Sequence, residues 1–371
     1  MRQFRISVYA AAEGVGRFGP LQGPIDRQLF ALDRACVDPR IGATAQIDRE
    51  ASPAFRYRLE GRGPGKAINL GEGNTGDPRE LVDFVRWSRA ACPASCEITV
   101  LSGHGLGYLT SLAGWAMGTR AILPNTAANG TRDLLTTLEL ADALGACGRE
   151  RGRPTELVAF DACLMNTIEV LTEVSPHAEA AVGTPDELSG GGYDLAGAAS
   201  GMAQAGGGLS PSRIADTFAA RYAPQNEADM CTATDLRCFR TVEASLRGVS
   251  KMLADLAGRP GGREVTQRLF LQASSAMNRF RANGLADLGA LRSFASGVPG
   301  PLAGALDAAL ERIDRGIIRR NAGPAARHMF GISIAAPGSA EQWRRDRMDY
   351  LPLRFSRESG WGAMLDRVFV H

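Results

Sequence analysis

Short apolar runs and longer helical periods alternate along the first half of the chain. The apolar runs predict strands at Arg5–Ala11, Ala43–Ile47, Glu97–Leu101, Leu157–Phe160 and Ala178–Gly183, with an edge strand or hairpin arm at Phe55–Leu59. Apolar residues at helical spacing predict helices at Ile25–Cys36, Asp77–Ala90, Thr131–Leu144 and Leu164–Val174. Strands that alternate with helices are typical of an α/β fold with a mostly parallel sheet.

Beyond about residue 205 the pattern becomes mainly helical. It predicts helices at Ser210–Ala223, Phe239–Ala257, Gly262–Arg279, Gly284–Ser296, Pro301–Arg319 and Leu351–Val370. It also predicts a short strand at Thr232–Leu236 and a late strand at His328–Ala335. No linker forces a boundary, so we expect an α/β core over residues 1–205 and a mainly helical region over 206–371. That region is expected to add the late strand to the same globular unit.

A histidine and a cysteine follow two of the predicted strands. His104 lies in the loop after Glu97–Leu101, and Cys163 follows Leu157–Phe160 directly. The interval of about sixty residues leaves room for one crossover helix, so the two strands are expected to be parallel neighbours. A thiol and an imidazole at adjacent strand ends can act as nucleophile and base. The alternative is an inert core cysteine and a turn histidine.

The same placement predicts how the pair would work. If a helix begins at Leu164, its dipole favours the thiolate form of Cys163. His104 would accept the thiol proton and later protonate a leaving amine. The backbone N–H groups of Gly105 and Cys163 would bind the oxyanion of an acyl intermediate.

Composition excludes several other classes of function. The 371 residues are 44% hydrophobic, with a mean hydropathy of −0.12 and a net charge of +2, so no nucleic-acid partner is indicated. The seven cysteines form neither a regular disulfide framework nor a zinc motif, and no metal is expected. No apolar run reaches the roughly twenty residues of a membrane span, and the N-terminal run resembles a strand more than a signal peptide. We therefore expect a cytoplasmic protein without a membrane partner.

Several motifs resemble the clostripain family of cysteine peptidases. The carriers are SGHG at 102–105 and FDACLM at 160–165, supported by INLGEGNTGDPRELVDFVRW at 68–87 and GISIAAPGS at 331–339. The resemblance implies a caspase-hemoglobinase-like three-layer α/β/α sandwich with a mostly parallel central sheet. It also implies that His104 and Cys163 are the catalytic pair, without an obligatory third residue. Some family members use calcium, so calcium is implied here by resemblance alone.

Asp161, two residues before the cysteine, has two interpretations. It can be an ordinary helix cap, or it can recognise a cationic substrate side chain, because the resemblance implies cleavage after Arg or Lys. Asp186, Glu187 and Asp194 lie in a second acidic, glycine-rich loop and are further candidates for substrate binding. Asp194 can equally be a helix cap.

The segment between His104 and Cys163 is the expected site of self-cleavage, because family members are commonly cut there. Arg120 and Arg132 lie in or beside an irregular stretch, and a basic linker before the cysteine strand contains Arg149, Arg151 and Arg153. Exposed polar loops are where nicking concentrates, so we favour the loop near Arg120. The alternative is a loop that covers the cleft of an enzyme active as a single chain.

The leading hypothesis is therefore a monomeric cysteine endopeptidase that cuts protein or peptide substrates after Arg or Lys. A second hypothesis keeps the fold and changes the primary specificity. A third is a catalytically silent caspase-fold protein that binds peptides.

Overall fold

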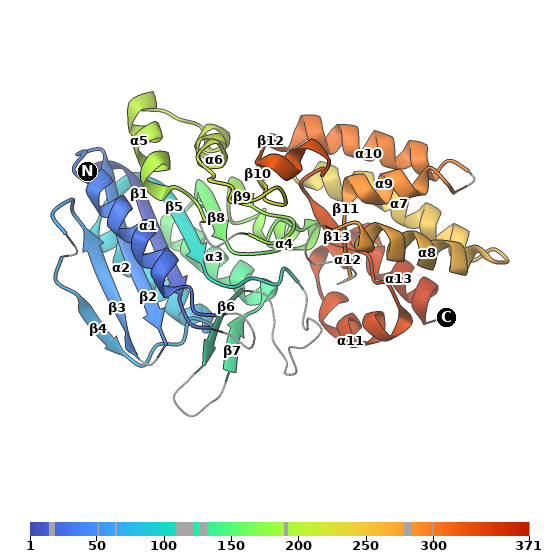
Figure 1. Ribbon diagram of the computed structural model, residues 1–371, viewed down its shortest axis with the longest axis horizontal. Coiled ribbons are helices and arrows are strands. Elements are labelled where there is room, and N and C mark those ends of the chain that lie inside the picture. Colours follow the sequence, from blue (N-terminus) through green and yellow to red (C-terminus); the bar gives the residue numbers. More distant parts are fainter. Residues whose placement is uncertain are drawn as a thin grey trace.

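A nine-stranded sheet runs through the centre of the structure in the order β12-β10-β9-β8-β5-β1-β2-β3-β4 (Figure 1). It belongs to a computed structural model that describes residues 1–14, 19–50, 52–63, 65–108, 122–126, 132–188, 192–277, 284–298 and 300–370. Strands β9, β8, β5, β1 and β2 are parallel to one another, and antiparallel strands flank them at both edges. The expected mostly parallel centre is confirmed.

The strands are β1 (Arg2–Ala11), β2 (Ile41–Arg49), β3 (Ser52–Leu59), β4 (Ile68–Gly71), β5 (Ala94–Ser102), β6 (Ile122–Thr126), β7 (Arg132–Leu135), β8 (Leu157–Asp161), β9 (Ala180–Gly183), β10 (Cys231–Asp235), β11 (Leu285–Asp287), β12 (Ile318–Ala322) and β13 (Ser333–Ala335). The helices are α1 (Gln22–Ala35), α2 (Pro78–Ala91), α3 (Thr137–Arg151), α4 (Ile168–Val174), α5 (Leu195–Ala205), α6 (Pro211–Ala220), α7 (Arg240–Ala257), α8 (Gly262–Ser275), α9 (Leu288–Ala295), α10 (Leu302–Gly316), α11 (Ala340–Tyr350), α12 (Arg354–Ser359) and α13 (Trp361–Phe369), with a 3-10 turn at Pro324–Arg327.

Helices cover both faces of the sheet, as the three-layer expectation requires. Alternate residues of β1 point to opposite faces: Ile6 and Val8 belong to a core shared with α1, α5 and α6, while Tyr9 belongs to a core shared with α2, α3 and α4. The second core continues without a break into the C-terminal helices, which lie on the right in Figure 1. Because strands in the parallel centre are buried on both faces, their sequences are apolar at nearly every position.

The region after residue 205 contributes to the central sheet as well as to the helical part. Strands β10 and β12 extend the sheet beyond β9, and β11 pairs with β13 in a separate two-stranded sheet. The buried carboxylate of Glu169, in the first turn of α4, accepts hydrogen bonds from the Ala335 N–H and the Tyr350 hydroxyl at 2.9 Å each. This one side chain therefore ties the core to β13 and α11.

Several sequence predictions differ from the structure. The predicted helix Leu351–Val370 is divided at Gly360 into α12 and α13, and the predicted helix Pro301–Arg319 ends at Gly316, before strand β12. The predicted helix Thr131–Leu144 begins at Thr137, because Arg132–Leu135 pairs with β6 as a strand and Thr136 forms a capping box with Glu139. The predicted helix Gly284–Ser296 begins with strand β11. The late strand predicted at His328–Ala335 is a strand only over Ser333–Ala335, and it pairs with β11 and not with the central sheet. The last difference, at Leu164, concerns the candidate site.

A buried ion network closes the amino end of the parallel strands. Glu97 forms an ion pair with Arg5, and each of these two side chains is 3% exposed. Glu97 also pairs with Arg89, whose Nε atom lies 2.9 Å from the carboxylate. Arg151 pairs with Glu156 at 2.7 Å, and Glu156 accepts the Glu97 N–H at 2.8 Å. Each buried charge thus has an oppositely charged partner, as burial demands. In the described parts of the chain, no helix is both long and apolar enough to cross a membrane.

Candidate active site

His104 and Cys163 lie at matched positions on neighbouring parallel strands. Strand β5 pairs with β8 up to Ser102 opposite Asp161, and each candidate residue lies two positions beyond that last pair. The Gly103 N–H donates to the Asp161 carbonyl at 3.1 Å, so the pairing continues into the two loops. The prediction that the two strands are parallel neighbours is confirmed.

The loops are in direct contact because position 105 is glycine. A Cβ atom added to Gly105 would overlap the Cys163 carbonyl oxygen and lie 2.9 Å from Ala162 Cβ and 3.2 Å from Cys163 N. No backbone carbonyl among the described residues accepts the N–H of Gly105 or of Cys163. Neither N–H is therefore used in a backbone hydrogen bond of the described chain, as the oxyanion role predicted from the sequence requires.

The helix after Cys163 begins later than predicted. It starts at Ile168 with Thr167 as its cap, while Leu164 adopts a left-handed conformation with φ of 60°. The Leu164 N–H donates to the Asp186 carbonyl at 2.9 Å, and the Asn166 N–H donates to the Thr184 carbonyl at 2.9 Å. These bonds to the following loop hold Leu164–Asn166 out of a helical conformation, so the prediction that a helix dipole acts on the Cys163 thiol is wrong.

The Cys163 thiol is held by the loop after β9. The Leu188 N–H donates to Sγ at 3.3 Å, and Sγ is 3.9 Å from the Leu188 carbonyl oxygen. Burial raises the pKa of Cys163 to about 12, the Leu188 hydrogen bond opposes this rise, and the carboxylates of Glu187, Asp186 and Asp161 add to it. The thiol is therefore neutral in this structure at physiological pH.

His104 is half-buried and meets the loop after β1. Its Nε2 atom is 3.2 Å from the Gly19 carbonyl oxygen. Burial lowers the pKa of His104, and the contact with Gly19 raises it by a smaller amount. A neutral ring that donates from Nε2 to Gly19 carries its lone pair on Nδ1. The sequence did not indicate this role for Gly19.

Asp161 is buried beneath the site, with 6% of its surface exposed. It caps no helix; its Oδ2 atom accepts a hydrogen bond from Ser102 Oγ at 2.9 Å. Burial raises the pKa of Asp161, while Ser102, the Gln28 side chain and the Tyr193 N–H oppose the rise. Gly192 packs against this group, because an added Cβ would overlap Gln28 Nε2 and Asp161 Oδ1. The helix-cap interpretation of Asp161 is therefore excluded.

The other acidic candidates separate into different environments. Asp186 is buried and accepts the Glu187 N–H at 2.8 Å, while Glu187 is half-buried beside the thiol. Asp194 is the N-cap of α5 and accepts the Gly197 N–H at 2.8 Å, which is the helix-cap role that the sequence left open. No cluster of His, Cys, Asp or Glu in the described ranges could hold a metal ion.

The candidate cleavage positions also differ in their surroundings. Arg120 lies outside the described residues, and Arg132 is the first residue of β7. Arg149 and Arg151, expected in a linker, belong to the last turn of α3, and Arg153 pairs with Glu156 at 2.9 Å.

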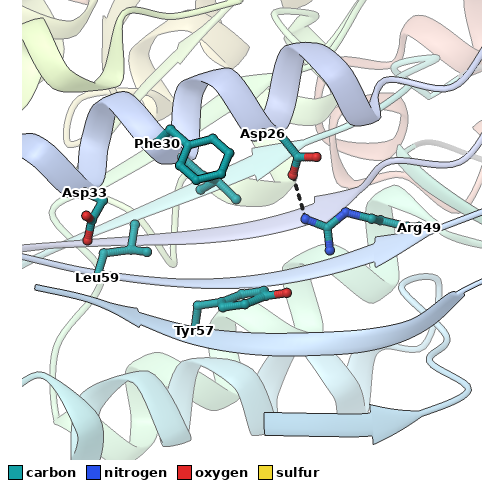
Figure 2. Close-up of a pocket in the computed structure, with 7 residues that line it drawn as sticks. Asp26, Phe30, Asp33, Arg49, Tyr57 and Leu59 are labelled. Carbon is teal, nitrogen blue, oxygen red and sulfur yellow. Dashed lines mark hydrogen bonds and ion pairs between the residues drawn. The ribbon is translucent and has the colours of Figure 1, made fainter. Parts of the chain in front are cut away.

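A separate cleft opens between α1 and the strands β2 and β3 (Figure 2). Phe30 and Tyr57 face each other across it, and the ion pair between Asp26 and Arg49, at 2.6 Å, closes one end. The lining includes neither His104 nor Cys163, so this cleft is distinct from the candidate active site.

The sequence profile of the clostripain family, peptidase family C11, matches residues 50–267, more than half of the chain. The chain belongs to the clostripain family. This clostripain-family protein is a cysteine-type peptidase, and its substrates are proteins or peptides. A search of curated proteins finds no match.

Solved clostripain-family structures share the fold over nearly the whole chain. A secreted C11 cysteine protease from Bacteroides thetaiotaomicron, bound to an irreversible peptide inhibitor, superposes with a TM-score of 0.67 at 14% identity, covering 97% of this chain and 100% of that one. An inactive zymogen C11 protease from Parabacteroides distasonis superposes with a TM-score of 0.66 at 16% identity, covering 96% and 98%. The three-layer fold inferred from the motifs is therefore confirmed.

Proposed function

We propose that this peptidase is an endopeptidase that uses Cys163 as nucleophile and His104 as base, and that cleaves after Arg or Lys. The observation that carries the proposal is the matched placement of the two residues, each two positions beyond the paired strand ends at Ser102 and Asp161. The carboxyl ends of parallel strands are where α/β proteins place their sites.

Each chemical step has a named group in this arrangement. The Cys163 thiol transfers its proton to His104 as Sγ attacks the substrate carbonyl, and the Gly105 and Cys163 N–H groups bind the resulting oxyanion. His104 then protonates the leaving amine, which leaves a thioester on Sγ. Water, deprotonated by His104, hydrolyses that thioester and restores the thiol. The Gly19 carbonyl supports the neutral tautomer that begins the cycle.

The acidic surroundings of the thiol support a preference for basic substrates. Asp161, Asp186 and Glu187 all raise the pKa of Cys163, so the free enzyme disfavours thiolate. A cationic substrate side chain beside Asp161 would offset that negative field and lower the pKa of the thiol. Binding and activation of the nucleophile would then be coupled, and uncharged substrates would be turned over more slowly.

A panel of peptide substrates with Arg, Lys, Gln or Leu before the cleaved bond tests the proposal. We expect cleavage after Arg and Lys only, and its loss in both Cys163→Ala and His104→Ala. Asp161→Asn should lower kcat/KM on Arg and Lys substrates by about a hundredfold or more and remove the preference for them. Residual activity above a few per cent in Cys163→Ala, or equal losses of Asp161→Asn on all substrates, would contradict the respective assignments.

We also propose that the peptidase cuts itself after Arg120. The supporting argument is the position of Arg120 between His104 and Cys163 together with the basic specificity proposed above, whereas Arg149, Arg151 and Arg153 lie in a helix end or in ion pairs. Intact-mass measurement of the wild type, Cys163→Ala and Arg120→Gln tests the idea. We expect two fragments from the wild type and none from either variant. A fully active wild type of 39.4 kDa would show that cleavage is not required.

A further inference from the structure

Three buried oxygen atoms at or beside Asp161 have no hydrogen-bond partner of normal geometry among the described residues, although the Gln28 side chain and the Tyr193 N–H lie close enough to Asp161 to oppose the rise in its pKa. The three atoms are Asp161 Oδ1 and the hydroxyl oxygens of Tyr193 and Tyr222. Tyr193 is 1% exposed and Tyr222 is 7% exposed. Burial of a polar group without a partner is costly, so such a set indicates a site completed by a group from outside the chain.

Distant parts of the sequence bring these atoms together. Tyr193 follows Gly192, whose backbone packs against the Asp161 carboxylate, and Tyr222 follows helix α6. The two tyrosines form an isolated antiparallel bridge, with ring centroids 5.9 Å apart. Burial raises the pKa of both hydroxyls, and the charge of Asp161 adds a smaller rise to each, as the charge of Cys163 does for Tyr222. Tyr193 therefore adjoins the backbone that packs against the carboxylate, and Tyr222 packs against Tyr193, on the same side of the sheet as α1, α5 and α6.

The missing partner has a definable chemistry. No cationic side chain of the described residues is among the groups that shift the pKa of Asp161, whereas buried Glu97 has Arg5 and Arg89 beside it. The site thus offers one carboxylate and two neutral hydroxyls, without a resident cation. A guanidinium group presents several N–H donors in a fixed planar fork, more than one carboxylate oxygen can accept.

We propose that Tyr222, together with Tyr193, determines specificity at the Asp161 pocket by accepting the guanidinium N–H groups of a substrate arginine. The inference rests on the basic specificity proposed above and extends it from basic residues in general to Arg over Lys. The compact ammonium of lysine satisfies its donors with Asp161 and water, so it gains less from the hydroxyls. The sequence contained no signal for this role, because Tyr222 lies almost sixty residues beyond the nucleophile.

The ratio of kcat/KM for Arg and Lys peptides of otherwise identical sequence tests the inference. We expect Tyr222→Phe to lower kcat/KM by about 10- to 50-fold on the Arg peptide and by less than about threefold on the Lys peptide. Tyr193→Phe should shift the ratio in the same direction. Tyr9→Phe is the matched control, because Tyr9 also has a fully buried hydroxyl without a partner but belongs to the opposite core. It should leave the ratio unchanged.

Thermal unfolding and the Asp161→Asn variant separate the outcomes. Removal of a hydroxyl that has no partner should leave the Tm of Tyr222→Phe equal to or above that of the wild type, so a selective loss on Arg cannot come from unfolding. If Asp161→Asn removes basic specificity but neither tyrosine variant changes the Arg to Lys ratio, the inference is overturned and the proposed function stands. If Asp161→Asn affects all substrates equally, the proposed specificity itself fails.

Discussion

Gly105→Ala should damage catalysis through one added methyl group. Gly105 has no positive φ, so alanine fits the backbone, and the effect comes from contact alone. The added Cβ would overlap the Cys163 carbonyl oxygen and lie 2.9 Å from Ala162 Cβ, where ordinary contacts begin near 3.4 Å. These neighbours are backbone or short side-chain atoms, so the two loops must separate by roughly 0.5–1 Å to accept the methyl group.

That separation acts directly on the proposed nucleophile and oxyanion donors. A misplacement of about 1 Å at a reacting centre costs about 100-fold in rate. We expect kcat/KM of Gly105→Ala to fall about 100-fold, with the free energy of unfolding lowered by about 1–3 kcal/mol. The measurements are steady-state kinetics on the Arg peptide, urea unfolding, and circular dichroism to verify the fold.

Gly248→Ala supplies the matched control. Gly248 lies inside helix α7, and an added Cβ would meet nothing within 4 Å. Alanine is the better helix former, so this variant should be more stable by about 0.5–1 kcal/mol, with unchanged kcat/KM. A folded Gly105→Ala enzyme within threefold of wild-type kcat/KM would refute the argument that close packing of the two loops sets the geometry of the site.

Three further predictions concern stability. Glu97→Gln should lower the free energy of unfolding in urea by about 3–5 kcal/mol, because it leaves Arg5 buried beside a neutral group. Lys251→Ala, which removes an exposed ion pair, should lower it by less than about 0.5 kcal/mol. Similar losses in the two variants would contradict this argument. Burial raises the pKa of Glu169 to about 7 from 4.5, so the folded state keeps a proton that the unfolded chain loses, and stability falls as the pH rises through that window. Glu169→Gln should therefore gain up to about 3 kcal/mol over the wild type between pH 4 and pH 8, and a constant difference would oppose this account. Asp194→Ala should lower the free energy of unfolding by about 1 kcal/mol through the lost helix cap, and it should leave the ratio of kcat/KM for Arg and Lys peptides unchanged. A changed ratio would show that Asp194 takes part in substrate binding.

The sequence alone determined the arrangement of the parallel strands and the pair at their ends. Alternation of short apolar runs with helical periods specifies which residues are buried on which face, and parallel strands release their loops at one edge. His104 and Cys163 could therefore be placed together before any contact was known. The helix predicted to begin at Asp77 likewise begins there, with Asp77 as its cap and Pro78 at its first position, because a cap is a local interaction.

Tertiary contacts decided the rest of the candidate site. Leu164–Asn166 has helix-compatible residues, but hydrogen bonds to Asp186 and Thr184 hold it out of a helical conformation, and the helix begins only at Ile168. The spacing of apolar residues indicates which positions are buried, but it does not indicate which other segment they contact. It therefore could not predict those hydrogen bonds. The carbonyl of Gly19 reaches His104, and Tyr222 packs against Tyr193, for the same reason: folding brings together groups that are distant in sequence and carry no local pattern of their own.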